Sequence, residues 1–172
     1  MDVHGRTDAA VLVPLYERGG ELHAVFTRRR ADLRRHAGEI SFPGGRQDET
    51  DEDLRLTALR EAEEEIGLPA DAVCFAGALP PIATFVTSYA VYPFVGVIED
   101  GHEWRPSAAE VDAVLELSLP ALLAGFSRQR LVRRGVPFRT PVYELDGHFI
   151  WGATARILEH LYERIAPVLE AG

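Results

Sequence analysis

Runs of apolar residues predict several β-strands along this chain. Stretches rich in Val, Phe, Tyr and Ala predict strands at residues 9–16, 22–28, 73–79 and 89–98, with a shorter one at 114–117. Arg18-Gly19-Gly20 joins the first two strands and favours a hairpin, as does Asp146-Gly147 within residues 143–151. Pro80 and Pro81 interrupt the pattern and leave a loop near residues 84–88.

Apolar residues at three- and four-residue spacing predict helices. One stripe predicts a helix over residues 51–66, with Thr50 as its N-cap and Gly67 as a left-handed C-cap. A second helix is predicted over residues 154–169, and a short one over 119–124. Strands flanked by two long helices predict an α/β/α sandwich with a mixed β-sheet, formed by residues 1–172 as a single domain.

Composition narrows the class of protein. With 172 residues, 47% of them hydrophobic, the chain can bury a core without disulfides, and its lone cysteine, Cys74, lies among apolar neighbours that predict a core thiol. The formal net charge of −9 argues against nucleic-acid binding. Since the sequence has neither a signal-peptide pattern nor an apolar run of membrane-spanning length, we expect a cytoplasmic protein without a membrane partner, either monomer or homodimer.

Glutamates on the first predicted helix suggest a metal site. On a helical projection Glu61 and Glu65 follow the edge of the apolar stripe, Glu64 lies beside Glu61, and Glu63 points to solvent. Like charges held at a core edge are costly unless a cation neutralises them. Because Mg²⁺ prefers oxygen ligands, these three carboxylates predict a magnesium site, with Mn²⁺ as a substitute. The alternative is a solvated acidic helix face.

An arginine-rich segment precedes a glycine turn. Five arginines fall within residues 28–35, and guanidinium groups bind phosphate oxygens bidentately. Phe42-Pro43-Gly44-Gly45 follows, where two glycines let the backbone approach a ligand closely. A second basic run, between residues 128 and 139, matches no motif and predicts exposed surface or a loop over the ligand.

These motifs together resemble the Nudix hydrolases. Arg60, Glu61, Glu64, Glu65 and Gly67 fit the R-E-x-x-E-E-x-G core of the Nudix box. The general Nudix pattern has five residues between the second glycine and the next glutamate, whereas six separate Gly45 from Glu52 here. We therefore expect Glu52 to stabilise the start of the helix rather than to bind metal. The resemblance implies that the Gly44 carbonyl is a metal ligand and that Arg60 orients a metal-bound glutamate, although plain surface packing of Arg60 stays open.

The segment before the box resembles that of the coenzyme A pyrophosphatase subgroup, which also has the longer loop. Eight residues fall on the subgroup's offsets, namely Thr27, Arg29, Arg34, Gly38, Phe42, Pro43, Gly44 and Gly45, while Arg30 stands where a small residue is usual. The predicted substrate-binding residues are therefore Arg29, Arg34, Gly38, Phe42 and Gly45. The resemblance implies Mg²⁺-dependent hydrolysis of coenzyme A to 3′,5′-ADP and 4′-phosphopantetheine.

Several points of function stay open at this stage. Glu64 is the first candidate for the general base, with Glu103, Glu110 and Glu116 as alternatives on later segments. His36 is a minor candidate for contact with the substrate. A Nudix hydrolase of another nucleotide, such as ADP-ribose, and a non-catalytic nucleotide sensor are the alternative functions, though a sensor has no chemical need for three convergent carboxylates.

Overall fold

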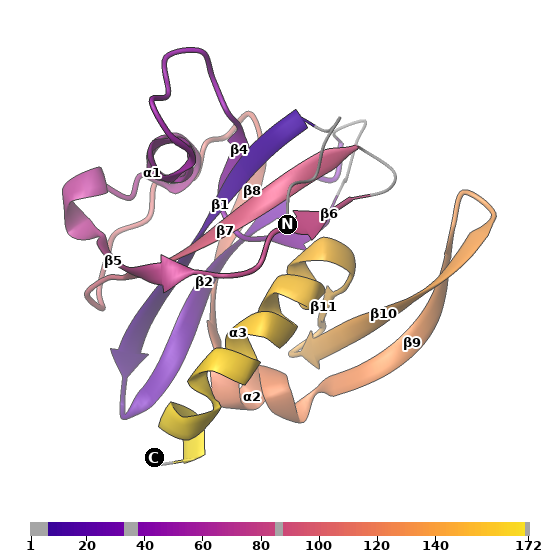
Figure 1. The fold of residues 1–172 in the computed structure, drawn as a ribbon. Helices are drawn as coiled ribbons and strands as arrows, with labels where there is room; N and C mark the ends of the chain where they lie inside the picture. Colours follow the sequence, from indigo (N-terminus) through magenta and orange to yellow (C-terminus); the bar gives the residue numbers. More distant parts are fainter. Residues whose placement is uncertain (1–6, 33–37, 85–87, 171–172) are drawn as a thin grey trace.

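The computed structural model describes residues 7–32, 38–84 and 88–170, and its strands form two sheets (Figure 1). The larger sheet contains β1 (Thr7–Arg18), β2 (Glu21–Arg29), β3 (Ile40–Ser41), β4 (Gly44–Arg46), β5 (Cys74–Ala78), β6 (Ile82–Ala83), β7 (Tyr89–Val97) and β8 (Val111–Ser118). The smaller sheet contains β9 (Phe126–Arg133), β10 (Val136–Leu145) and β11 (His148–Ile150). The helices are α1 (Leu54–Ile66), α2 (Leu119–Ala124) and α3 (Gly152–Glu170), with a one-turn 3₁₀ helix at Ala70–Ala72.

The larger sheet is mixed and lies between helices, which confirms the predicted fold class. Strand β1 pairs in parallel with β7 and antiparallel with β2 and β4. Its side chains alternate between two cores: Ala10 and Leu12 pack with α1, whereas Val13 and Leu15 pack with α2 and α3 on the other face. A central strand buried on both faces explains why the sequence shows an almost continuous apolar run there.

Pro14 lies in this central strand although proline cannot donate to a ladder. Its position resolves the conflict, because β4 pairs with β1 over Ala9–Val11 and β2 pairs with it only from Leu15 onward. Pro14 therefore falls at the change of partner on one side of β1. The same change leaves room for the Phe42–Gly45 segment to enter the sheet, which positions the candidate site.

Helix α1 begins later than predicted. The N-cap is Asp53, whose side chain accepts a hydrogen bond from the Leu56 amide at 2.9 Å, so the prediction of Thr50 as the cap was wrong. Asp51 and Glu52 lie outside the helix, and Glu52 is exposed. The end of the helix is as predicted, since Gly67 adopts φ 73° and its amide bonds back to the last turn.

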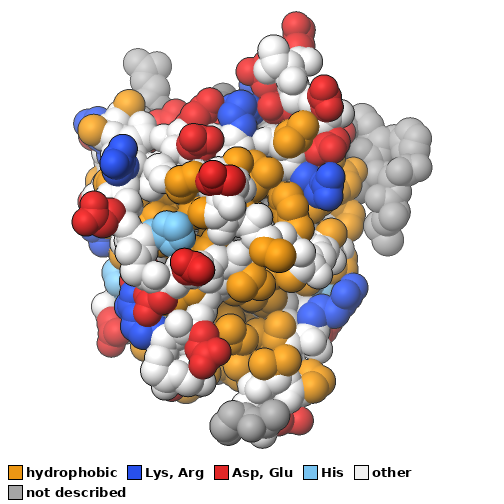
Figure 2. Space-filling view, turned by 90° about the vertical axis from the view of Figure 1, so that its left-hand side faces the viewer, with side chains coloured by type: hydrophobic (Ala, Val, Ile, Leu, Met, Phe, Trp, Pro, Cys, Tyr) orange, Lys and Arg blue, Asp and Glu red, His pale blue; other side chains and the backbone are white. Residues whose placement is uncertain are grey.

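Three other local predictions differ from the structure. Cys74 is exposed on the edge strand β5 and not buried in the core. Figure 2 shows one face of the molecule, on which hydrophobic side chains reach the surface between acidic ones. Gly44 and Gly45 form a short strand rather than only a turn. Of the two alternatives for the second basic run, the loop is wrong and exposed surface is confirmed, because the run lies on the β9–β10 hairpin, which projects from the body (Figure 1), and most of its arginines are exposed.

The two glycine turns form as predicted. Gly19 and Gly20 both have positive φ between β1 and β2, and Asp146 and Gly147 do so between β10 and β11. Of the apolar stripe predicted for helix α3, Ile157, Leu161 and Ile165 pack against the core that contains Val13, whereas Val168 is exposed. The helix begins two residues earlier than predicted, at Gly152. No helix of the described residues has the length and apolar character needed to cross a membrane.

Candidate active site

A cavity of about 300 Å³ opens at the junction of β2, β4, α1 and the start of α3. Its walls include Gly44 and Gly45 from β4, Glu65 from α1 and Arg29 from β2. Residues far away in the sequence, around Thr154 at the start of α3, complete it. The glycine turn, the glutamate helix and the arginine segment of the sequence thus meet at one place.

Glu65 is the most deeply placed carboxylate of the three. Its Oε2 accepts a hydrogen bond from the Gly44 amide at 3.1 Å, so the turn holds the side chain in the cavity wall. The pKa of Glu65 is raised to about 8, mainly by burial and to a smaller extent by the charges of Glu61 and Glu110, although the Gly44 hydrogen bond opposes this shift. Burial disfavours the charged form of this carboxylate, and a bound cation would stabilise that charged form.

Glu61 lies against the second glycine. A Cβ atom on Gly45 would lie 2.6 Å from Cδ of Glu61, so only glycine leaves space for this carboxylate. Burial raises the pKa of Glu61, while the Arg60 guanidinium lowers it. Gly44 is needed for another reason, because a Cβ atom added at this position would lie 2.3 Å from the Ala10 carbonyl oxygen. The two glycines therefore serve close packing as well as approach to a ligand.

Arg60 joins the acidic groups around α1. Its Nη1 lies 3.0 Å from Glu61 Oε1 and 3.3 Å from Glu64 Oε2. On its other side Nη2 lies 2.9 Å from Asp51 Oδ2 and donates to the Arg46 carbonyl at 3.1 Å. The orienting interpretation of Arg60 fits this geometry, because the guanidinium fixes the Glu61 carboxylate relative to β4.

Asp51 is a residue whose importance the sequence did not reveal. Its carboxylate is almost fully buried, accepts from Arg60 and the Thr57 hydroxyl, and caps the Asp48 amide. The Arg60 hydrogen bonds hold its pKa at about 2. Within the run Asp51-Glu52-Asp53 nothing in the sequence separates the buried acid from its exposed neighbour. The only sequence signal was the longer loop, which brings this run back toward Arg60.

Neighbouring side chains of β2 point to opposite faces of the sheet, which separates Arg28 from Arg29. Thr27 and Arg29 face the cavity, whereas Arg28 on the opposite face pairs with Asp112 at 3.1 Å. Arg30, beyond the end of the strand, pairs with Asp32 and donates to the Ala108 carbonyl at 2.7 Å. Of these three arginines only Arg29 lines the cavity, as the sequence predicted.

The other predicted substrate residues are placed as follows. Phe42 is buried, stacks on Phe26 with ring centroids 4.6 Å apart, and forms part of the cavity wall. Gly38 has φ 71°, which favours glycine, and its amide donates to the Arg29 carbonyl at 3.0 Å. Arg34 and His36 lie outside the described residues, and their predicted roles stay predictions.

The candidates for the general base separate in space. Glu110, just before β8, lines the cavity with Glu65. Glu64 is exposed beside Arg60 and is not among the cavity residues. Glu116 is engaged elsewhere, accepting from Trp104 Nε1 at 2.6 Å and from Arg18 at 2.8 Å. Glu103 is exposed on the segment before β8 and does not line the cavity.

The donor set fits a hard divalent cation. Among the described residues, no group of three or more acidic, histidine or cysteine side chains is arranged so that it could hold a metal ion by itself. Mg²⁺ needs few protein carboxylates, since water and substrate phosphate fill the rest of its shell. Glu61 and Glu65 supply oxygens beside Gly44 and Gly45, and buried carboxylates with raised pKa values are the groups such an ion would stabilise.

Comparison with known proteins identifies the family. Residues 6–133 match the NUDIX domain. The chain belongs to the Nudix family. It is 43% identical over 155 residues to the uncharacterized Nudix hydrolase NudL of Salmonella paratyphi B, covering 89% of this chain and 80% of that protein.

Solved Nudix structures share the fold at low identity. The Nudix hydrolase RenU from M. smegmatis superposes with a TM-score of 0.67 at 15% identity, covering 95% of this chain and 88% of that one. The NUDIX domain of Shewanella oneidensis NrtR, in complex with ADP ribose, gives a TM-score of 0.60 at 15% identity over 94% and 89% of the chains. The Nudix architecture includes α1 and the sheet that carries the candidate site.

Proposed function

We propose that this Nudix hydrolase cleaves the diphosphate of coenzyme A or its derivatives, in a Mg²⁺-dependent reaction that yields 3′,5′-ADP and 4′-phosphopantetheine. The observation that carries the proposal is that Arg29 lines the same cavity as Glu65 and the Gly44–Gly45 strand. The arginine segment is the part of the sequence that resembles coenzyme A pyrophosphatases, and the cavity joins it to the hydrolase motif.

Each group has a proposed task. Glu61 and Glu65, with Glu64 and the Gly44 carbonyl, would hold a divalent ion, which when bound would neutralise phosphate charge and make water a better nucleophile. Arg29 binds a phosphate oxygen through its guanidinium fork. Arg60 holds Glu61 in place through their 3.0 Å ion pair.

The cleavage consumes one water. A water oxygen forms a bond to one phosphorus, and the bond between that phosphorus and the bridging oxygen breaks. The bridging oxygen leaves with the other phosphate, and the proton of the water passes to a carboxylate. We propose Glu110 for that proton, because it lines the cavity, whereas the Glu64 carboxylate is paired with Arg60 and 59% exposed.

Product analysis tests the substrate assignment. The protein would be incubated with Mg²⁺ and, in parallel, coenzyme A, dephospho-coenzyme A, ADP-ribose and a diadenosine polyphosphate, with Glu65→Gln and chelator controls. We expect 3′,5′-ADP to appear from coenzyme A, with slower turnover of the other three substrates. Faster hydrolysis of ADP-ribose or the dinucleotide would overturn the coenzyme A assignment. Binding without hydrolysis of any substrate would favour a nucleotide sensor.

The two base candidates are separated by matched variants. If Glu110 accepts the proton, Glu110→Gln should lower kcat by roughly 10²- to 10⁴-fold with little change in the Mg²⁺ dependence. Glu64→Gln should instead raise the Mg²⁺ concentration needed for half-maximal rate. The opposite pattern would return the proton-accepting role to Glu64.

A further inference from the structure

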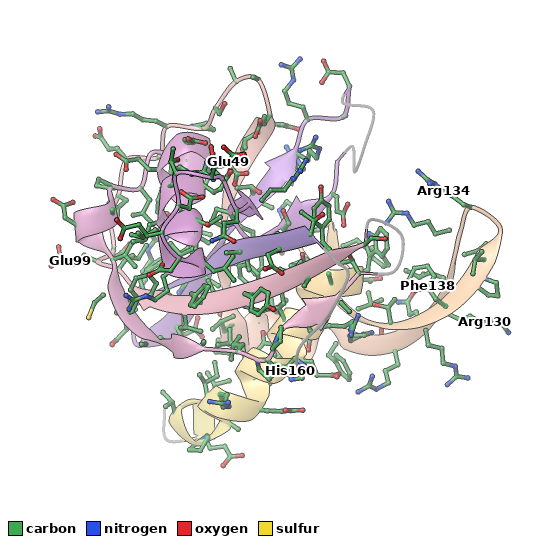
Figure 3. The ribbon with its side chains drawn as sticks, turned by 45° about the horizontal axis from the view of Figure 1, so that its top comes forward. Glu49, Glu99, Arg130, Arg134, Phe138 and His160 are labelled. Atoms are coloured by element: carbon green, nitrogen blue, oxygen red, sulfur yellow. The ribbon has the colours of Figure 1, made fainter. Side chains whose placement is uncertain are left out.

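A second cavity, of about 570 Å³, lies beside the first and has no part in the chemistry described so far. Three aromatic side chains line this aromatic cavity: Phe138 comes from β10, Phe149 from β11 and Trp151 from the segment that leads into α3. Leu131 and Arg133 of β9 close the outer side. In Figure 3 the Phe138 side chain points to the concave side of the hairpin, while Arg130 extends from the outer side.

At two places in the chain, the residues that line one cavity coincide with, or lie next to, those that line the other. Glu39 lines both of them. Trp151 lines the aromatic cavity, and Ala153, two residues further along the chain, lines the catalytic one. One extended ligand can therefore occupy both, with its diphosphate near Arg29 and another part of the molecule under the β9–β10 hairpin.

The side chains that line the aromatic cavity favour a flat, polar ring as the bound group. Phe138 and Trp151 have ring centroids 5.8 Å apart, and the Arg133 guanidinium carbon lies 5.3 Å from the Trp151 centroid. Aromatic faces and a guanidinium plane both stack on nucleobases. An aliphatic acyl chain would offer neither a ring face for these aromatic side chains nor a π-system for the Arg133 guanidinium.

We propose that this aromatic cavity binds the purine base of the substrate, stacked against Trp151 and Phe138. The inference rests on the proposed function, since it assumes that a nucleotide diphosphate occupies the neighbouring site. It also sets the orientation of coenzyme A, with the adenine end under the hairpin and the pantetheine arm directed away from it. The second basic run of the sequence thereby contributes a base-binding residue, Arg133.

Tryptophan fluorescence offers a test that does not depend on turnover. The chain has two tryptophans, so Trp104→Phe leaves Trp151 as the only one. The variant would be titrated with 3′,5′-ADP and, separately, with 4′-phosphopantetheine. We expect saturable quenching by 3′,5′-ADP and none by 4′-phosphopantetheine. Quenching by 4′-phosphopantetheine alone, or by neither compound, would overturn the proposal.

Variants of the aromatic walls give a second readout. Trp151→Leu and Phe138→Leu should each raise the KM for coenzyme A and the Kd for 3′,5′-ADP by about 5- to 100-fold, as loss of a base-stacking partner does. Trp151→Phe should retain most of the affinity. The matched control is Phe126→Leu, which changes an exposed aromatic residue of the same hairpin outside the cavity and should leave both values unchanged.

The outcomes separate this inference from the proposed function. If coenzyme A is hydrolysed but Trp151→Leu and Phe138→Leu bind 3′,5′-ADP normally, the base-binding proposal is wrong and the proposed function stands. If coenzyme A is not a substrate but ADP-ribose quenches Trp151 and Phe138→Leu weakens that binding, the base site stands and the coenzyme A assignment falls. Circular dichroism of each variant would exclude misfolding as the cause of weaker binding.

Discussion

Single residues in β4 connect the fold to the candidate chemistry, and the two glycines do so differently. The Cβ of Gly45→Ala would meet the carboxylate of Glu61, the far end of a flexible side chain. We expect this variant to lose activity by roughly 10²-fold, as when a group beside a metal ligand is disturbed, while its melting temperature changes little. Kinetic assay and thermal unfolding of the same preparation would check the prediction.

Gly44→Ala is the matched comparison for Gly45→Ala. Its Cβ would lie 2.3 Å from a backbone oxygen of β1, which cannot move without shifting the sheet. We therefore expect loss of stability, by about 1–3 kcal/mol as in other overpacked sites, in addition to loss of activity. Equal stability of the two variants in urea would contradict this account of the turn.

The arginines of β2 give a second contrast at the residue scale. Arg29 lines the cavity and Arg28 pairs with Asp112 on the other face of the strand. Arg29→Ala should raise the KM for the diphosphate substrate by at least about tenfold, because a charge-assisted phosphate contact contributes roughly 1.5–3 kcal/mol. Arg28→Ala serves as the control and should leave KM unchanged. A similar rise in both variants would point to the general charge of the segment.

At the scale of elements, the loop before α1 depends on one buried ion pair. Asp51→Asn removes the charge that Arg60 binds, and we expect a loss of about 1.5–3 kcal/mol in the free energy of unfolding at pH 7. Since the pKa of Asp51 in the folded protein is about 2, below its ordinary 3.8, its stabilising contribution is present above pH 3.8 and lost as pH falls toward 2.

Urea unfolding at several pH values measures that contribution. The difference between wild type and Asp51→Asn should be constant from pH 7 to about pH 4 and should shrink below it. Glu52→Gln is the control, because Glu52 is the exposed neighbour and should have little effect at any of these pH values. A difference that persists unchanged at pH 3 would mean that shape rather than charge holds the loop.

The same elements show what a sequence can predict. Runs of apolar residues predicted β1, β2, β5, β7 and β8, and a period of 3.6 predicted α1 with its Gly67 cap, whereas β3, β4, β6 and β9 were not predicted. The start of α1 was not predicted correctly, because Asp51, Glu52 and Asp53 are all possible caps and only a specific hydrogen bond selects Asp53. The exposure of Cys74 was missed because β5, apolar throughout, lies at the edge of the sheet.

The candidate site was predictable only where its residues lie within one motif. Glu61, Glu65 and the glycines follow from spacing along the chain, and the resemblance to the coenzyme A pyrophosphatase segment selects Arg29 over Arg28. Tyr89 and Thr154 lie outside the Nudix box and the arginine segment, and they meet the cavity only through the packing of β7 and α3. Contributions of this kind depend on tertiary contacts, as does the burial of Asp51.

At the scale of the whole molecule, a bound divalent ion should stabilise the folded chain, because it binds carboxylates that converge only after folding. At tenfold excess over its dissociation constant the ion adds about 1.4 kcal/mol. For a chain of this size that corresponds to an increase of roughly 3–6 °C in melting temperature. We expect this increase on adding Mg²⁺ to metal-free protein, with reversal by a chelator, and not in Glu65→Gln.

The matched control is Glu163→Gln, which removes an exposed carboxylate on α3. It controls for non-specific ion effects, because the formal net charge of the chain is −9. An increase retained in Glu65→Gln would place the ion elsewhere on this acidic molecule and remove Glu65 from the metal site.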